Sequence, residues 1–306
     1  MATEQLLKRV RTRLTIHAHR KVRGLLDGEY TSVFHGRSLE FDDLRPYVPG
    51  DEVKDIDWKA TARLDALMTR RYTASRKQTV VLVVDTGRSM AATAASGESK
   101  RDLAVLAAGT MGYIATRHAD LVALVAGDSR HTRFLRAQST EAHLERLLRD
   151  IHSHSTLDAP PSDLTAQLAY VGKAFSSGRI LVVIADDRAL SATERDQLRR
   201  LAVQHEILWI TIADADLMRE ALVSQGMSDV ETAVNLPSFV RENPALRSEF
   251  EASVARQATD TQDLFDSLAI SSRRVTSEAD VVPGLFRLLE LHKSGRGRSG
   301  RGRSGR

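Results

Sequence analysis

Four short apolar runs limit what this chain can fold into more than any other feature of its sequence. A continuous run of valine and leucine occupies residues 80–84, and similar runs follow at 121–125, 179–184 and 206–212. Such runs are typical of strands that are buried on both faces of a parallel sheet. Because helical patterns separate them, the sequence predicts one doubly wound α/β domain over residues 78–292.

The segments between these strands have the spacing of helices. Ser99 and Asp102 have the spacing of a capping box and predict a helix that starts there. A short strand at 131–135 is expected to pair antiparallel at an edge of the sheet. Residues 152–161 are expected to form a loop, and 269–273 a short strand. Further helices are predicted at 141–151, 164–175, 193–203, 244–268 and 278–292.

Composition restricts the chemistry. The chain has 306 residues and no cysteine, which excludes disulfides, thiolate zinc sites and thiol nucleophiles. The sequence pI of about 9.5 comes from the tail, because residues 294–306 hold five of the 44 Lys and Arg residues and no acid. Without those five, 39 basic residues face 40 acidic ones. Residues 293–306 are therefore predicted to be a disordered tail, either solubilising or a weak ligand of RNA and other polyanions.

Residues 1–27 are predicted to contain a basic amphipathic helix. Its apolar residues at 6, 7, 10 and 14 recur at helical spacing among many Lys and Arg residues. The favoured interpretation is that this stripe packs on the chain's own domain. The alternative is binding to anionic lipid, which would place a cytoplasmic protein at the membrane periphery. No apolar run approaches the ~20 residues that a membrane helix needs.

Charged and aromatic residues gather at 36–63. Pro49-Gly50 suits the centre of a type II turn. Arg45 and Arg63 can form a charge-assisted network with Asp51, Asp55 and Asp57, and the ring of Trp58 can be buried, which would make the stretch a structural clasp. The alternative is that some of these side chains face outward and dock a partner. The residues concerned are Arg45, Tyr47, Gly50, Asp51, Asp55, Asp57, Trp58 and Arg63.

Two carboxylates hold the same position relative to their strands. Asp85 ends the first apolar run, and Asp186 follows the run at 179–184. Ligands of open α/β sheets bind beyond the carboxyl ends of the strands, so we expect the two side chains to lie together there. With the hydroxyls of Ser89 and Ser162 they offer hard oxygen ligands for magnesium. The alternative is that both carboxylates cap loop amides and helix N-termini.

The turn Asp85-x-Gly87-x-Ser89, the Ser162-Asp-Leu loop and the strand before Asp186 resemble a von Willebrand factor A domain. The resemblance implies a metal-ion-dependent adhesion site formed by Asp85, Ser89, Ser162 and Asp186, with Mg²⁺ as its ion. The site is degenerate, because Gly87 stands where that family has a serine and Ser162 where it has threonine.

The upstream stretch resembles a second family signature. Arg45-x-Tyr47-x-x-Gly50-Asp51, followed by Asp55-Ile-Asp57-Trp58 and Ala-Arg63, is similar to the signature of the domain of unknown function 58 (DUF58). Its members carry this segment directly before a von Willebrand A-like domain. The resemblance covers residues 28–290, with a signature segment at 28–77 packed on the domain at 78–292. It implies a MoxR-type AAA+ ATPase as partner and no defined enzymatic activity.

The resulting expectation is a non-enzymatic adaptor that joins the ATPase to an unknown client protein in chaperone-like assembly or maturation, with the degenerate metal site as a recognition device. A metal-dependent phosphoester hydrolase using the same carboxylates is the first alternative, although no histidine stands near either strand end. RNA or polyanion binding through the tail is the second.

Overall fold

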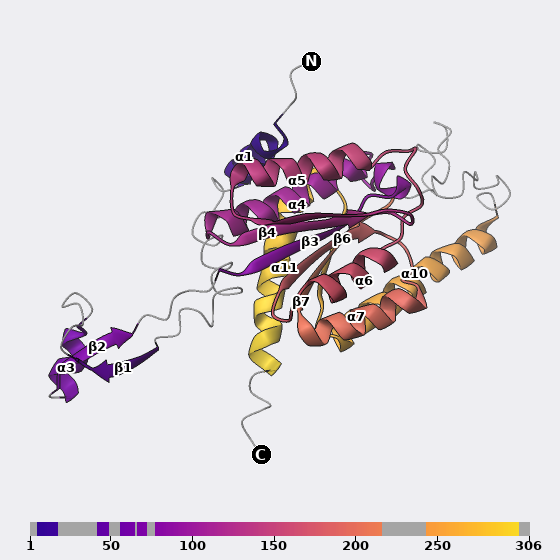
Figure 1. Ribbon diagram of the computed structural model, residues 1–306. Helices are drawn as coiled ribbons and strands as arrows, with labels where there is room; N and C mark the ends of the chain where they lie inside the picture. The colour runs from indigo at the N-terminus through magenta and orange to yellow at the C-terminus, as the bar shows by residue number, and fades with distance from the viewer. Residues whose placement is uncertain are drawn as a thin grey trace.

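A six-stranded sheet in the order β5-β4-β3-β6-β7-β8 forms the centre of the protein (Figure 1). The computed structural model describes residues 5–17, 42–48, 56–64, 66–71, 77–215 and 243–299. Neighbouring strands run parallel except for β4 and β5, which pair antiparallel at one edge. The strands are β3 (Thr79–Asp85), β4 (Leu121–Gly127), β5 (Thr132–Gln138), β6 (Ile180–Asp186), β7 (Glu206–Ile212) and β8 (Ser271–Val275).

Helices cover both faces of this sheet. One core contains side chains of α1 (Leu6–His17), α4 (Lys100–Arg117), α5 (Glu141–His154) and α11 (Glu278–Ser299). The other contains side chains of three further helices. These are α6 (Thr165–Ala174), α7 (Ala192–Gln204) and α10 (Pro244–Ser267). The predicted α/β class, with a mostly parallel sheet between helical layers, is therefore confirmed.

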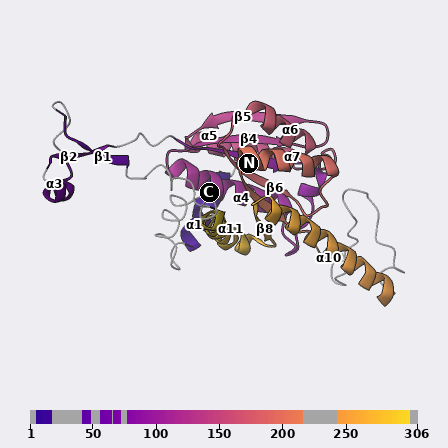
Figure 2. The ribbon, with the colours of Figure 1, turned by 90° about the horizontal axis from the view of Figure 1, so that it is seen from below.

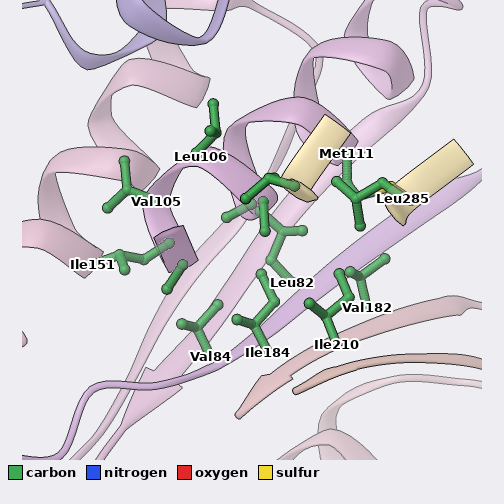
Figure 3. Close-up of a cluster of buried hydrophobic side chains, with 14 of the residues drawn as sticks. Leu82, Val84, Val105, Leu106, Met111, Ile151, Val182, Ile184, Ile210 and Leu285 are labelled. Atoms are coloured by element: carbon green, nitrogen blue, oxygen red, sulfur yellow. The ribbon is translucent and has the colours of Figure 1, made fainter. Parts of the chain in front are cut away.

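The central strands alternate their side chains between the two cores. In β3, Leu82 and Val84 face the first core, whereas Val81 and Val83 face the second. All seven residues of β3 and all seven of β6 are buried. Figure 3 shows how Leu82 and Val84 meet apolar side chains of the covering helices and of β6 and β7. Burial on both faces explains why these strands are apolar throughout.

The chain reverses its direction across the sheet between β3 and β6. From β3 it continues to β4 and β5 on one side, and it then returns to add β6, β7 and β8 on the other. A switch point of this kind opens a crevice beyond the carboxyl ends of the two strands. Asp85 and Asp186 end these two strands.

Helix α1 packs on the domain with its apolar stripe inward. Leu7, Val10 and Leu14 belong to the first core and are buried. The helix begins against Glu145 of α5, whose carboxylate accepts the backbone N–H of Leu7 at 2.7 Å. This arrangement matches the favoured interpretation of the basic helix. The rest of the predicted helix, from residue 18 to 26, lies outside the described residues.

The basic face of α1 forms ion pairs with acidic side chains of the domain. Arg9 contacts Asp102 of α4 and Glu278 of α11, and Arg13 also contacts Glu278. Burial alone would raise the pKa of Glu278, but the hydrogen bond and charge of Arg9, with the charge of Arg13, lower it. Within the described part of the chain, no helix is long and apolar enough to cross a membrane.

A separate small unit precedes the sheet in the chain (Figure 1). Strand β1 (Asp42–Pro46) pairs antiparallel with β2 (Met68–Arg71), and helix α3 (Trp58–Leu64) contacts β2. The sequence pattern does not predict α3. The described hydrogen bonds of this unit lie within it, so its packing on the domain stays a prediction. Pro49-Gly50 lies outside the described residues.

Two helices extend further than the sequence predicts. Helix α5 continues to His154, so residues 152–154, which were expected in a loop, form its last turn. In this turn the His154 ring bonds the carbonyl of Asp150 at 2.8 Å. Helix α11 continues to Ser299, past the predicted start of the tail at 293. The N-cap of α4 is Ser99 as predicted, but its side chain makes no capping hydrogen bond.

The two halves of the long helix α10 differ in burial. Its last turns contribute Leu264 and Phe265 to the second core, where Phe265 packs on Trp209 with ring centroids 5.0 Å apart. Residues 248–260 are exposed, and Figure 2 shows this part extending beyond the sheet.

Candidate functional site at the carboxyl edge of the sheet

Asp85 is the most deeply buried acid at the switch point. Its side chain is fully buried, and its Oδ1 accepts the backbone N–H of Gly87 at 2.8 Å. Its Oδ2 is also buried. Burial raises the pKa of Asp85 to about 7, and the negative charge of Asp186 acts in the same direction, whereas the hydrogen bonds from Gly87 N–H and from Ser162 and the positive charge of Arg188 act to lower it. At neutral pH, a substantial fraction of the molecules therefore carries a protonated Asp85 carboxyl.

The hydroxyls of Ser89 and Ser162 form a hydrogen bond with each other. Ser89 belongs to the short 3-10 helix η3 (Arg88–Ala91), and Ser162 lies in the loop before α6. The backbone holds this loop in place, because the N–H of Arg88 donates to the carbonyl of Pro160 at 2.9 Å. Asp85, Ser89 and Ser162 thus converge from β3, η3 and the loop.

Gly87 has no room for a side chain. A Cβ atom built on it would lie 2.5 Å from Ser162 Oγ and 2.6 Å from Ser162 N, far inside van der Waals contact. A side chain at this position therefore requires the loop that contains Ser162 to shift.

Sequence reasoning missed Lys100, the cation of this edge. Its side chain has no exposed surface, and its Nζ donates to Asp186 Oδ1 and to Asp214 Oδ1. Asp186 ends β6, and Asp214 follows β7. Each is the last residue of an Ile-Ala-Asp sequence. That repetition was one available signal. The other is a lysine at the first position of α4, where the helix dipole disfavours a positive charge.

Arg188 and Glu194 form a further ion pair beside the site. Glu194 is completely buried, bonds Arg188 and completes a capping box with Ser191 at the start of α7. It also accepts the N–H of Leu164 at 3.2 Å, which ties the loop before α6 to α7. Burial would raise the pKa of Glu194, but the hydrogen bonds and charge of Arg188 lower it.

These contacts test whether the implied Mg²⁺ fits. Such an ion would be held by oxygen atoms of Asp85, Ser89, Ser162 and Asp186, yet Asp186 Oδ1 already accepts the Lys100 ammonium and the N–H of Asp187 at 2.8 Å. The described residues contain no group of three or more His, Asp or Glu side chains placed to hold a metal ion. One oxygen of Asp186 is therefore already occupied, and an Mg²⁺ ion held by Asp85, Ser89, Ser162 and Asp186 stays a prediction.

The signature residues that the structure describes lie in the small unit. Asp57 is buried, and its Oδ1 accepts the N–H of Ala60 at 3.1 Å, which caps α3. Trp58 is 64% exposed, Arg63 is exposed and Tyr47 is half-buried. The ring burial that the clasp interpretation gives Trp58 is therefore not observed. The side chain of Arg45 is not described, and Gly50, Asp51 and Asp55 lie outside the described residues.

Comparison with known proteins identifies the family. The model of the family described as "Protein of unknown function DUF58" matches residues 43–260, which is most of the chain. The chain belongs to this family. It is 28% identical over 290 residues to uncharacterized proteins of Mycobacterium bovis and Mycobacterium tuberculosis, covering 92% of this chain and 88% of each relative.

A solved structure with partial similarity is an aerotolerance-related membrane protein from Bacteroides fragilis. It is 16% identical, with a TM-score of 0.37, over 44% of this chain and 67% of that one. A score this low carries no argument about function.

Proposed function

We propose that this DUF58 protein is a non-enzymatic adaptor that docks a MoxR-type AAA+ ATPase through its β1–α3–β2 unit and presents a client protein for chaperone-like assembly or maturation. The observation that carries the proposal is the exposure of Trp58, a large aromatic side chain in the family signature. Tryptophan and arginine are enriched among the residues that dominate binding energy at protein interfaces, and both Trp58 and Arg63 are exposed.

The unit separates structural residues from surface residues. Asp57 is buried and caps α3, while its N–H donates to Met68 O at 2.8 Å and so ties the start of the helix to β2. Thr61 adds a second tie, because its hydroxyl accepts the N–H of Met68 at 3.0 Å. With the helix fixed in this way, Trp58 and Arg63 are presented at little entropic cost, which favours docking over the clasp for these two residues.

Charge indicates which kind of surface the unit meets. Helix α3 has the sequence WKATARL, with two basic residues and no acid. The proposed ATPase surface is therefore an apolar pocket for the indole with acidic side chains around it.

Binding of the purified ATPase to variants of this protein tests the proposal. Trp58→Ala is expected to weaken binding by ~30-fold or more, the scale of an interface hot spot. Its melting temperature should stay unchanged, because the ring is exposed. Leu157→Ala is the matched control, since Leu157 is 62% exposed but belongs to the central domain. Wild-type affinity in Trp58→Ala would refute docking through α3, and a large fall in its melting temperature would support the clasp.

The hydrolase alternative has its own test. Wild-type protein is incubated with a generic phosphodiester and Mg²⁺ or Mn²⁺, beside Asp85→Asn. We expect no turnover above the Asp85→Asn background. Metal-dependent turnover that Asp85→Asn abolishes would replace the adaptor with an enzyme.

A further inference from the structure

The side chain of Lys100 makes a buried polar contact at the carboxyl edge of the sheet. It is among the largest fully buried side chains in the described residues, yet it carries an ammonium group. Burying such a charge is costly unless it is paired and hydrogen-bonded. Asp186 and Asp214 provide two carboxylate acceptors, one from the end of β6 and one from the segment after β7.

The backbone fixes this ammonium in place. The N–H of Lys100 donates to Ala92 O at 3.0 Å, which sets the first turn of α4 against η3. The loop between them pairs with the exit of β7, because Ala95 N donates to Ala213 O at 3.1 Å and Ala215 N to Thr93 O at 3.3 Å. The lysine stem is therefore directed at the carboxylates by main-chain contacts on both sides.

The protonated state of Lys100 follows from its neighbours. Its Nζ lies within hydrogen-bond distance of two carboxylate oxygens, and opposite charges this close favour the protonated form. A protonated amine has no lone pair and cannot ligate a metal. It instead repels a second cation at the same carboxylates.

We propose that the Lys100 ammonium is the built-in cation of this sheet edge and takes the place of a divalent ion at Asp186 and Asp214. The inference goes beyond the proposed function and does not depend on the ATPase. It assigns Lys100 as a covalently attached counter-ion that joins α4, β6 and the exit of β7, and it makes that junction independent of Mg²⁺.

One consequence concerns recognition. In an adhesion site, a partner carboxylate completes the coordination of an exposed ion. Here the cation has no exposed surface and both of its acceptors are supplied by the chain. A partner carboxylate therefore cannot reach it, which directs docking to other surfaces such as α3.

Metal titration of the full chain tests this assignment. Wild-type protein is stripped with EDTA, and its melting temperature is followed as Mg²⁺, Ca²⁺ or Mn²⁺ is added. We expect that any change in the wild type is the same in Asp186→Asn. Lys100→Met removes the ammonium but keeps an apolar stem, and it should lower the melting temperature by about 10 °C in EDTA because two carboxylates lose their cation. Added Ca²⁺ or Mg²⁺ should partly restore it, because Asp214 is 47% exposed and open to solvent.

The double variant Lys100→Met/Asp186→Asn is the control. With one carboxylate neutralised it should melt higher than Lys100→Met in EDTA and lose the rescue by metal. Should Lys100→Met fail to fold, Mn²⁺ binding to wild type and to Asp186→Asn, followed by electron paramagnetic resonance, decides alone. Equal Mn²⁺ binding by the two supports the proposal. Binding that Asp186→Asn abolishes, or a metal-dependent rise in the wild-type melting temperature that this variant loses, overturns it.

Discussion

The backbone of Gly87 lies directly against that of Ser162, so that any Cβ at position 87 would stand 2.6 Å from Ser162 N. This contact predicts the result of restoring the adhesion-site pattern. Gly87→Ser should destabilise the fold by about 1–3 kcal/mol, because the loop before α6 must move off η3 to admit the side chain. Chemical denaturation of the two proteins measures the difference in the free energy of unfolding.

The control for this change is Gly172→Ser in α6, where a Cβ would meet Leu201 Cδ2 at an ordinary 3.7 Å. It should be close to neutral. A Gly87→Ser protein with wild-type stability and a new Mg²⁺-dependent rise in melting temperature would show that the loop opens readily into a metal site.

Gly109 of α4 is the contact point for α1. A Cβ there would lie 2.5 Å from Val10 Cγ2, and a valine in a helix cannot change its χ1 angle easily. Although alanine is a better helix former by ~1 kcal/mol, Gly109→Ala should lower the free energy of unfolding by about 1–3 kcal/mol.

A double-mutant cycle separates this contact from a general helix effect. Val10→Ala removes the clashing methyl groups, so Gly109→Ala should cost at least ~1 kcal/mol less in that background. Gly172→Ala is the control, and it should be neutral or stabilising because its site has space. Additive costs for Val10→Ala and Gly109→Ala would contradict the close approach of α1 to α4.

The central sheet could be predicted because strands that are buried on both faces have continuous apolar sequences. Strands such as β3 and β6 must be apolar at every position, and turn residues bound them. The ends of the helices and the small unit have weaker signals in the sequence. Helix α3 is seven residues long and depends on the cap at Asp57 and on its contact with β2, and neither is visible as periodicity.

The site was predictable only in part. Asp85 and Asp186 could be placed because parallel strands bring their carboxyl ends to one edge. Lys100 could not be placed, since its partners come from 86 and 114 residues further along the chain and no local pattern encodes such a pairing. The close contact of Gly87 with Ser162 also depends on a loop path that the residue types do not specify.

Asp57 is predicted to be a structural residue of the signature. Asp57→Ala removes the cap of α3 and should destabilise the small unit by about 0.5–2 kcal/mol. Asp57→Asn retains an oxygen acceptor and should keep most of that stability. Hydrogen exchange at the Ala60 amide, whose N–H donates to Asp57, measures the effect directly. Equal protection of this amide in wild type and Asp57→Ala would contradict the capping role.

Asp85 predicts an unusual pH dependence of stability. Its pKa is about 7 in the folded protein, against about 3.9 in an unfolded chain, so between these values the folded state holds a proton that the unfolded state has released. Stability from this group is therefore complete below about pH 4 and is lost as the pH rises through 7, with a total of at most ~4 kcal/mol.

Asp85→Asn tests this dependence, because asparagine imitates the protonated acid and keeps an oxygen for the N–H of Gly87. The free energies of unfolding of both proteins are measured from pH 4 to pH 8, and their difference cancels the other titrating groups. Asp85→Asn should gain stability relative to the wild type as the pH rises from 4, most steeply between about pH 5 and 6, and the gain should level off above about pH 7. A difference that stays constant with pH would mean that Asp85 is ionised throughout and that its Oδ2 has a cationic or hydrogen-bonding partner.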